Sequence, residues 1–518
     1  MDINACVVLA KVYSGAVFGV DAYPIEIEVN AGHGDPSVVI VGLPDTAVKE
    51  SKDRVHTAIG NSGFKPHVGR TTINLAPADI KKEGPCFDLP IAVGILATQN
   101  MVPLGILAGC AMIGELALSG EVRKIRGVLP VALAMKKAGM RGMLVPSENA
   151  DEAAVVRGLD IFPVRNLREA VDFLAGKAPI APYQVDTELI FAAPNEHEDD
   201  FSDVKGQEYA RRAAEIAATG GHNLLLIGSP GTGKSMIAKR IASILPPLTL
   251  DEALESTKIH SIAGTLAAHQ ALVSRRPFRS PHHTISDAGL LGGGAHPMPG
   301  EVSLAHRGVL FLDELPEFHR NVLEVLRQPL EDGQVTISRA AATVTFPCRF
   351  MLVAAMNPCA CGFYGDTKRE CRCKSSQVQN YRNKISGPLL DRIDLHVEVP
   401  TIHYRELAGL TPGEDSATIR GRVIRARQIQ QDRFKSLRRL HCNSGMRPRD
   451  VQRFCVLNTD VQDVLKGALT ELNFSARAYD RIIKVARTIA DLAAEEHIQA
   501  HHVQEAIQYR TLDRQLWI

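Results

Sequence analysis

The sequence has almost no net charge, few aromatic residues and no long apolar run. Its 518 residues include 59 Lys or Arg and 58 Asp or Glu, so the total of +1 does not by itself indicate a polyanionic partner. A basic groove remains compatible with this total, because charges of opposite sign can lie on different faces. No stretch of about 18 apolar residues occurs, so we expect no membrane span.

Secretory features are also scarce. The N-terminal segment, MDINACVVLAKVYS, has neither a basic leader nor a small-residue cleavage site. The ten cysteines are scattered apart from one tight group, which fits a reducing compartment better than a disulfide scaffold. Hydrophobic residues make up 45% and charged residues 23% of the chain, as in ordinary soluble proteins. We therefore expect a cytoplasmic protein of about two to four domains.

The N-terminal third of the chain reads as an α/β domain. Residues 1–182 alternate strand-like runs with helical patterns, the clearest strands being 25–29, 37–43 and 71–77. Helical spacing is clearest over 45–61 and 88–99. This block therefore has enough apolar periodicity for a core of its own.

Two further blocks follow an acidic segment. Residues 183–203 are loop-like and suit a linker. Residues 204–400 form a second α/β block, and 401–518 are largely helical. For the basic run 421–441 we favour a solvated helix face, with phosphate contact as the alternative.

An octet in the second block matches a phosphate-binding loop. GSPGTGKS, residues 228–235, fits the spacing G-x-x-x-x-G-K-[ST], with an apolar strand before it and a helical pattern after it. Backbone N–H groups and the helix N-terminus would hold phosphates there, Lys234 would reach the β- and γ-phosphates and Ser235 would bind Mg²⁺. The predicted ATP-binding residues are Gly228, Ser229, Pro230, Gly231, Thr232, Gly233, Lys234, Ser235 and Asp313.

Two other strands end in polar residues suited to ATP hydrolysis. GVLFLDE, residues 308–314, ends in two carboxylates. We expect Asp313 to hold Mg²⁺ and Glu314 to polarise the attacking water. MLVAAMNP, residues 351–358, ends near Asn357, which would orient the same water.

This set of residues resembles the AAA+ ATPases. The resemblance implies that Arg392, within LLDRID, is an arginine finger acting on the neighbouring subunit's nucleotide. It also implies that Arg477 is a second sensor arginine on a lid helix. Glu314, Asn357, Arg392 and Arg477 are therefore the predicted catalytic residues.

Three local features narrow the resemblance. The Gly-, Pro- and His-rich segment 275–318 is similar to that of ComM/YifB-type proteins, relatives of the magnesium-chelatase ATPase subunit. For its His282 and His283 we favour a role in ordering the loop over metal binding. Residues 333–347 read as a hairpin like those that related helicases insert into a central pore. Arg339 at its turn would contact DNA phosphates, and an ordinary structural hairpin is the alternative.

A four-cysteine set forms the third feature. Cys359, Cys361, Cys371 and Cys373 suit tetrahedral Zn²⁺, although C-x-C spacing is tighter than the usual C-x₂-C. Structural zinc and four free thiols remain alternative interpretations. Catalytic zinc is disfavoured, because four thiolates leave no open coordination position.

The N-terminal block resembles the proteolytic domain of Lon-type proteases. Cys86 falls near the position of that family's serine, and Pro130 stands where the partner lysine is expected. A thiol without its base is a poor nucleophile at neutral pH. We therefore expect a non-proteolytic, Lon-like domain of the ribosomal S5 domain 2 type, followed by an AAA+ P-loop core and a helical lid.

The full resemblance implies an ATP-dependent hexameric DNA motor for branch migration in recombination and natural transformation. One alternative is a chelatase-type motor that remodels a protein partner for metal insertion. A second is an ATP-dependent protease, which the missing lysine disfavours. The implied cofactors are ATP and Mg²⁺, and the implied partners are further copies of the chain and DNA.

Overall fold

The computed structural model describes residues 9–192, 199–267, 269–294, 297–339, 343–366, 368–401, 412–437, 440–472 and 476–512. The chain forms two compact units. The N-terminal unit comprises Met1–Ala193 with Leu250–Ser274, and the C-terminal unit comprises Pro194–Thr249 with Arg275–Ile518. In the described parts, no helix is both long and apolar enough to cross a membrane.

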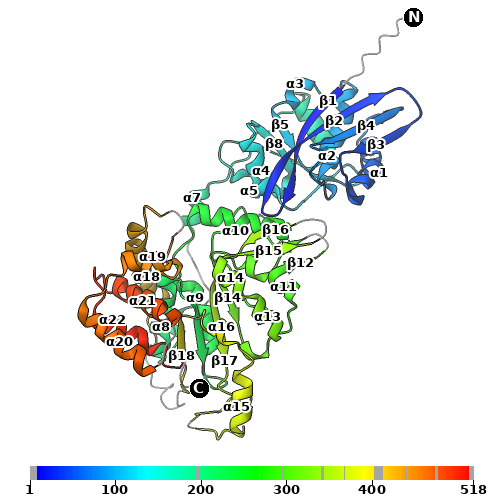
Figure 1. The fold of residues 1–518 in the computed structure, drawn as a ribbon. Helices are drawn as coiled ribbons and strands as arrows, with labels where there is room; N and C mark the ends of the chain where they lie inside the picture. The colour runs from blue at the N-terminus through cyan, green and yellow to red at the C-terminus, as the bar shows by residue number, and fades with distance from the viewer. Residues whose placement is uncertain are drawn as a thin grey trace, which may run out of the picture. The chain divides into compact units, whose positions relative to one another are not determined.

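A seven-stranded mixed sheet organises the N-terminal unit, in the order β3-β4-β2-β1-β5-β8-β9 (Figure 1). β1 and β2 form a long antiparallel pair, and β2 is also antiparallel to β4, whereas the remaining neighbours are parallel. The strands are β1 (Leu9–Phe18), β2 (Asp21–Gly32), β3 (Ser37–Val41), β4 (Arg70–Ala76), β5 (Cys110–Met112), β8 (Gly142–Pro146) and β9 (Asp160–Val164). The strands and helices predicted in this block are confirmed, whereas β1 was not predicted.

Helices bury their apolar sides against this sheet. Every residue of α2 is buried, which explains why its sequence, DLPIAVGILAT, is apolar all round. The helices are α1 (Thr46–Asn61), α2 (Asp88–Thr98), α3 (Leu104–Leu107), α4 (Val128–Lys137), α5 (Ala150–Ala154), α6 (Leu167–Leu174) and α7 (Thr187–Ala192). α7 lies within the segment expected to be a linker. A short pair, β6 (Glu115–Leu116) and β7 (Val122–Arg123), completes the unit.

One helix of this unit comes from the middle of the second block. α10 (Leu250–Ala263) packs on α4 through Leu254, and the carbonyl of Ser261 accepts from the N–H of Gly127 at 3.3 Å. Its Ser261 hydroxyl also donates to the buried carboxylate of Glu152. Residues 250–274 therefore share the core of the N-terminal unit, which the apolar pattern could not reveal.

The C-terminal unit is built on a five-stranded parallel sheet, in the order β11-β14-β17-β10-β18. Its central strands are fully buried, as expected of parallel strands covered on both faces. The strands are β11 (Phe278–Arg279), β14 (Val309–Leu312), β17 (Met351–Met356), β10 (Leu224–Ile227) and β18 (Leu395–Glu398). The helices around it are α8 (Glu208–Gly220), α9 (Lys234–Ile244), α11 (Asp287–Leu291), α12 (Glu301–Leu304), α13 (Arg320–Val325), α14 (Arg327–Asp332), α15 (Ser375–Arg382) and α16 (Gly387–Leu390).

Two small hairpins project from this core. β15 (Gln334–Ser338) pairs antiparallel with β16 (Thr343–Pro347), as the sequence predicted. β12 (Gly292–Gly293) pairs with β13 (Met298–Pro299), and it lies beside β15 (Figure 1). A Cβ on Gly292 would lie 2.9 Å from the Cδ1 atom of Ile337, so the two hairpins are in close contact.

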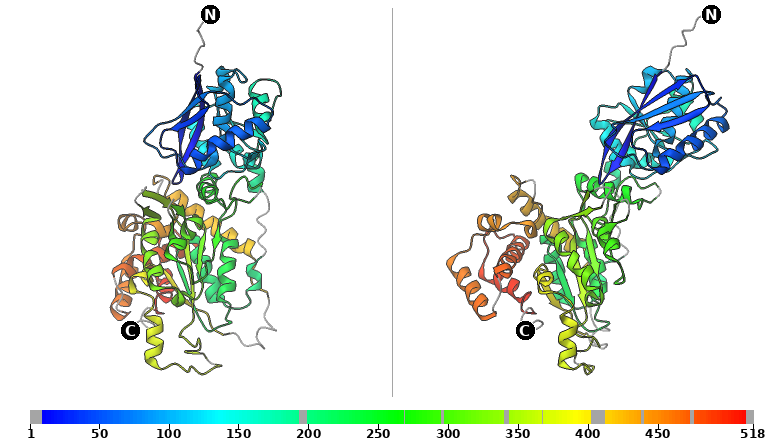
Figure 2. Two further views of the ribbon diagram at one scale, coloured as in Figure 1. Left: turned by 90° about the vertical axis from the view of Figure 1, so that its right-hand side faces the viewer. Right: turned by 45° about the vertical axis from the view of Figure 1, so that its right-hand side comes forward.

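The C-terminal helices form a lid that packs on α8. They are α18 (Ser416–Arg433), α19 (Pro448–Phe454), α20 (Thr459–Leu472), α21 (Ala476–Leu492) and α22 (Ala500–Gln508). Figure 2 shows these orange-to-red helices gathered on one side of the C-terminal unit. Val423 and Ala486 are buried in the core that α8 shares with the lid.

The basic run 421–441 is less exposed than expected. The half-buried Arg422 donates to Glu215 at 2.5 Å, and Arg427 donates to the carbonyl of Ala218 at 2.8 Å. Arg433 pairs with the buried carboxylate of Asp491. Among the described residues of the run, several arginines thus join the lid to α8, whereas Arg425 and Lys435 are exposed, as the favoured interpretation of a solvated face predicted.

Candidate active site

The predicted phosphate-binding loop connects β10 to α9. Gly231 and Gly233 have φ angles of 83° and 92°, which glycine adopts without strain. α9 begins at Lys234, so the loop leads directly to the free N–H groups of a helix N-terminus. N–H groups in this arrangement suit an anion such as a phosphate, in agreement with the predicted cradle.

Lys234 lies inside this cradle. Its Nζ donates to the carbonyl oxygens of Gly228 at 2.7 Å and Ser229 at 2.9 Å, and to Asn357 Oδ1 at 3.2 Å. Burial lowers the pKa of Lys234, while the charges of Asp313 and Glu314 oppose that shift. The ammonium group is therefore held where it can exchange carbonyl oxygens for phosphate oxygens.

Ser235 and Asp313 provide adjacent oxygen ligands. Ser235 Oγ donates to Asp313 Oδ2 at 2.6 Å, which joins the start of α9 to the residue that follows β14. Hydroxyl and carboxylate oxygens are the ligands that Mg²⁺ prefers, so this pair fits the ion that ATP requires.

Glu314 has a left-handed backbone, with φ 52° and ψ 47°. Its N–H donates to Asp313 Oδ1 at 2.9 Å, which fixes the two neighbouring carboxylates relative to each other. A non-glycine residue in this region is uncommon, and such strain often occurs at functional sites.

His283 is a neighbour of Glu314 that was not predicted from the sequence. Its Nδ1 lies 3.5 Å from Glu314 Oε2, and its ring meets Phe318 edge-on at 6.3 Å. The ring of His282 lies 4.1 Å from that of His283. Because His283 comes from a loop 31 positions upstream of Glu314, no local spacing in the sequence signals this contact.

The polar residues that follow neighbouring strands meet at one edge of the sheet. Lys234, Asp313 and Asn357 follow β10, β14 and β17, which are adjacent and parallel. Lys234 donates to Asn357, and the next residue, Ser235, donates to Asp313, so these groups gather at one edge of the sheet. The carboxyl edge of such a sheet is where open α/β folds bind their ligands.

Arg392 lies at the opposite edge. Its backbone carbonyl accepts from Asn223 Nδ2 at 2.8 Å, and Asn223 directly precedes β10. The P-loop starts at Gly228, directly after the last residue of β10. At the rise per residue of a strand, Asn223 and Gly228 are therefore about 16 Å apart. The guanidinium of Arg392 donates to the carbonyl of Pro388 at 2.7 Å and pairs with Glu331.

Arg477 lies at the same edge as Arg392. Its Nη1 is 3.9 Å from Asp391 Oδ2. One turn further along α21, Arg481 pairs with Asp394, whose carboxylate also accepts from the N–H of Asn223 at 3.0 Å. Neither arginine forms a contact with Lys234 or Asp313 among the interactions of the described residues.

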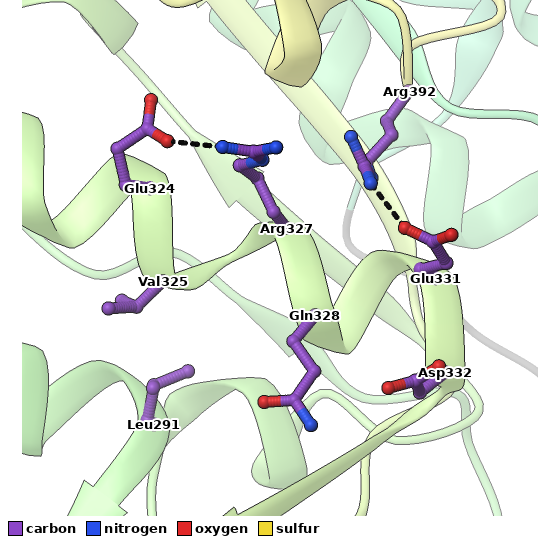
Figure 3. Close-up of a pocket in the computed structure, with 8 residues that line it drawn as sticks. All are labelled: Leu291, Glu324, Val325, Arg327, Gln328, Glu331, Asp332 and Arg392. Atoms are coloured by element: carbon purple, nitrogen blue, oxygen red, sulfur yellow. Dashed lines mark hydrogen bonds and ion pairs between the residues drawn. The ribbon is translucent and has the colours of Figure 1, made fainter.

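Two pockets adjoin Arg392. A pocket of about 190 Å³ brings Arg392 and Arg477 together with Asp480, Arg481 and Lys484. A larger pocket, of about 410 Å³, lies between α11 and the helices α13 and α14 (Figure 3). Its lining residues are Leu291, Glu324, Val325, Arg327, Gln328, Glu331, Asp332 and Arg392.

Arg339 follows β15 and is exposed. Val335, Ile337, Val344 and Phe346 bury one face of the hairpin, and its threonines face outward. The turn residues 340–342 lie outside the described parts of the chain. Arg339 is thus a cation at the base of the hairpin turn.

The four predicted cysteines form one cluster. Their sulfur atoms lie within 4.8 Å of one another, and Cys359 is buried. Nearby backbone N–H groups of Phe363 and Arg372 lower the pKa of Cys361 to about 6. The cluster belongs to the C-terminal unit, directly after Asn357.

Cys86 in the N-terminal unit lacks the features of a nucleophile. Burial, assisted by the negative charge of Asp88, raises the pKa of its thiol to about 12. Pro130 is buried in α4, in the segment where a lysine would be needed. This surrounding favours the neutral thiol, which argues against peptidase chemistry.

The chain matches known proteins along nearly its whole length. Residues 200–407 match the family "Magnesium chelatase, subunit ChlI", residues 27–149 match "Subunit ChlI of Mg-chelatase", and residues 413–510 match "Magnesium chelatase, subunit ChlI C-terminal". The chain is 46% identical to the uncharacterized protein YifB of Salmonella typhimurium over 510 residues, 98% of each chain. It is 45% identical to the competence protein ComM of Haemophilus influenzae over 513 residues, again 98% of each.

Part of the chain also matches a Lon protease. The chain is 28% identical to Lon protease 2 of Bacillus subtilis over 172 residues, 30% of each chain. The match agrees with the Lon-like resemblance of the N-terminal block. Together with the full-length relatives, these findings show that the chain belongs to the ComM/YifB family of magnesium-chelatase-like AAA+ ATPases with a Lon-like N-terminal region.

Proposed function

We propose that this protein is a ring-forming, ATP-driven DNA motor that performs branch migration during recombination and natural transformation. The observation that carries the proposal is the placement of Lys234 and Arg392 at opposite edges of one sheet. One relative is named a competence protein, which supports the cellular setting.

The separation favours a nucleotide site shared between subunits. Arg392 is anchored at the amino edge of β10 by Asn223, whereas Lys234 follows the carboxyl edge. These edges are about 16 Å apart, and an arginine side chain spans roughly half of that distance. Arg392 therefore does not reach the phosphate-binding loop of its own subunit. In a head-to-tail ring, the amino edge of one subunit would face the carboxyl edge of the next. Arg392 and Arg477 would then act together on the neighbour's ATP.

Each residue of the site would have a distinct role. Lys234 and the loop N–H groups would bind the phosphates, and Ser235 with Asp313 would hold Mg²⁺, which supplies charge neutralisation between the β- and γ-phosphates. Glu314 would accept the proton of the attacking water, and Asn357 would orient that water. Arg392 from the neighbour would stabilise the charge of the transferred phosphoryl group.

β17 would couple hydrolysis to movement on DNA. Three residues separate its first residue, Met351, from the end of the hairpin at Pro347, and it leads to Asn357, which contacts Lys234. A shift of β17 as ATP is hydrolysed would therefore move the hairpin. Arg339 would transmit this shift to a DNA strand through a phosphate, a contact that is independent of sequence.

Strand displacement tests the proposal directly. Labelled three-way and forked DNA would be incubated with the purified chain, ATP hydrolysis would be followed in parallel, and particle mass would be measured with and without ATP. We expect hexamer formation, DNA-stimulated hydrolysis and displacement that Glu314→Gln abolishes. A strictly monomeric protein that hydrolyses ATP at full rate and is indifferent to DNA would contradict the proposal. Stimulation by a protein partner alone would favour a chelatase-type motor.

A further inference from the structure

The loop from Cys359 to Cys373 has the dimensions of a tetrathiolate metal site. The Sγ atoms of Cys359 and Cys361 lie 3.3 Å apart. The Sγ atom of Cys371 lies 3.7 Å from that of Cys359 and 3.6 Å from that of Cys361. Four sulfurs at 2.3 Å around a tetrahedral Zn²⁺ would be about 3.8 Å apart. All four thiols are free, and the three separations are far longer than a disulfide bond.

Backbone groups are arranged around these sulfurs as a second layer of contacts. The N–H groups of Phe363 and Arg372 lie near Cys361, and the N–H of Cys373 lies near Cys371, where each lowers the pKa of the thiol beside it. Such N–H···S contacts fix the orientation of metal-bound thiolates. The described residues between β17 and α15 form neither helix nor strand, so a bound ion would supply the cross-link that this segment lacks.

The same loop touches the phosphate-binding loop at two points. A Cβ on Gly362 would lie 2.7 Å from Pro230 Cδ, so its backbone is in close contact with the loop. The carboxylate of Asp366 lies close enough to the hydroxyl of Ser229 for that hydroxyl to lower its pKa. Asp366 is itself held by the N–H of Lys368 at 2.7 Å and the Thr401 hydroxyl at 3.1 Å.

We propose that Cys359, Cys361, Cys371 and Cys373 bind one Zn²⁺ ion, and that this ion holds Gly362 and Asp366 against the phosphate-binding loop. ATP affinity then depends on a metal that takes no part in hydrolysis. The ATP half of this inference rests on the proposed function, whereas the zinc half does not.

The physical reason is preorganisation. Pro230 and Ser229 belong to the loop whose N–H groups must converge on the phosphates. With zinc bound, the contacts from Gly362 and Asp366 restrict this loop before ATP arrives, so less conformational entropy is lost on binding. Without zinc, both contacts depend on a segment with no regular structure.

Metal content and nucleotide affinity are measured separately. The full-length chain is purified under reducing conditions, its zinc is quantified by mass spectrometry, and the Kd of a fluorescent ATP analogue is measured with excess Mg²⁺. Cys371→Ser removes a ligand, and Cys442→Ser is the control, because Cys442 lies outside the cluster and contacts the hydroxyl of Ser444 at 3.3 Å. Asp366→Ala breaks the contact with Ser229 while leaving all four thiols.

We expect about one zinc per chain in the wild type and in Cys442→Ser, and little in Cys371→Ser. Asp366→Ala should retain its zinc and bind the analogue about fivefold to tenfold more weakly, the loss expected when one polar contact to the loop is removed. Removing zinc from the wild type with a chelator should weaken binding of the analogue to a similar extent, and adding zinc back should restore it. This comparison uses the wild type alone, so it does not depend on whether a variant folds.

Two results would overturn the inference. Wild-type protein with far less than one zinc per chain would rule out the metal site. An unchanged Kd in Asp366→Ala and in chelator-treated wild type would rule out the link to the phosphate-binding loop. A wild-type protein that contains zinc yet binds no ATP would instead contradict the proposed function and leave the metal site standing.

Discussion

Asn223 donates its side-chain N–H to the backbone carbonyl of Arg392 at 2.8 Å, and this bond holds Arg392 at the amino edge of β10. Asn223 Oδ1 also accepts from the N–H of Leu352 at 2.9 Å, so one side chain joins three parallel segments at that edge. Since the phosphate-binding loop leaves the other edge, the position of Arg392 favours action on a neighbour. The first prediction follows from this geometry.

Arg392→Ala should bind ATP with nearly unchanged affinity but lose about 10³-fold or more in hydrolysis, because charge stabilisation by such arginines is of that size. Lys234→Ala, which removes the phosphate contact, should neither bind nor hydrolyse ATP measurably. Mixing the two inactive variants should restore part of the turnover, since some interfaces then combine an intact Arg392 with an intact Lys234. Absence of rescue at every mixing ratio would count against action between subunits.

Glu314→Gln should bind ATP and hydrolyse it about 10²–10⁴-fold more slowly, because the amide cannot accept the proton of the attacking water. The variant should accumulate as an ATP-bound ring, which mass measurements would detect. Glu317→Gln is the matched control, because Glu317 is three positions away and pairs with Lys384 at 3.3 Å. Normal turnover in Glu314→Gln would remove this residue from the proposed role.

Asp394 should contribute strongly to stability. It is buried, pairs with Arg481 and accepts a hydrogen bond from the N–H of Asn223. Burial by itself raises the pKa of Asp394, but these partners lower it by more, so the pKa lies well below its usual range. Asp394→Ala removes the carboxylate that the guanidinium of Arg481 and the backbone N–H of Asn223 contact, and we expect a loss of about 3–5 kcal/mol in the free energy of unfolding. Asp432→Ala, at an exposed pair with Lys435, should cost about 1 kcal/mol or less. Chemical denaturation of both variants gives the comparison.

The sign of the pH dependence follows from the same residue. Because the folded pKa of Asp394 is depressed, its contribution is fully present above the unfolded value of about 4 and is lost as pH falls toward the folded value. The stability difference between wild type and Asp394→Ala should therefore shrink below about pH 4. A difference that stays constant from neutral to acidic pH would contradict this account.

Local residues were predictable from the sequence, whereas contacts between distant segments were not. The octet 228–235 and the strand ends at Asp313 and Asn357 follow from short-range patterns, because parallel strands bring their carboxyl ends together. The neighbour of Glu314, His283, comes from another loop, and no spacing rule connects them. Arg477 lies beside Arg392 only because α21 packs near the start of β18, which depends on the tertiary fold.

In the N-terminal unit, too, contacts between distant segments could not be predicted from the sequence. β1, LAKVYSGAVF, was not predicted, and its burial pattern alternates only in its first half, with Gly15, Ala16 and Val17 breaking a clear period of two. α10 has apolar residues that indicate burial, but periodicity cannot say which core receives them. Leu254 packs beside α4, across more than a hundred residues of chain.

Arg339→Ala tests whether the hairpin touches DNA. Each phosphate contact adds roughly one to the slope of log affinity against log salt, because bound counterions are released. We therefore expect weaker binding to single-stranded and forked DNA and a slope reduced by about 1, with ATP affinity unchanged. Arg425→Ala, at an exposed arginine of α18, should leave the slope as it is, since Arg425 lies outside the hairpin. Equal slopes for wild type and Arg339→Ala would show that this arginine does not contact phosphates, and DNA movement would then need another surface.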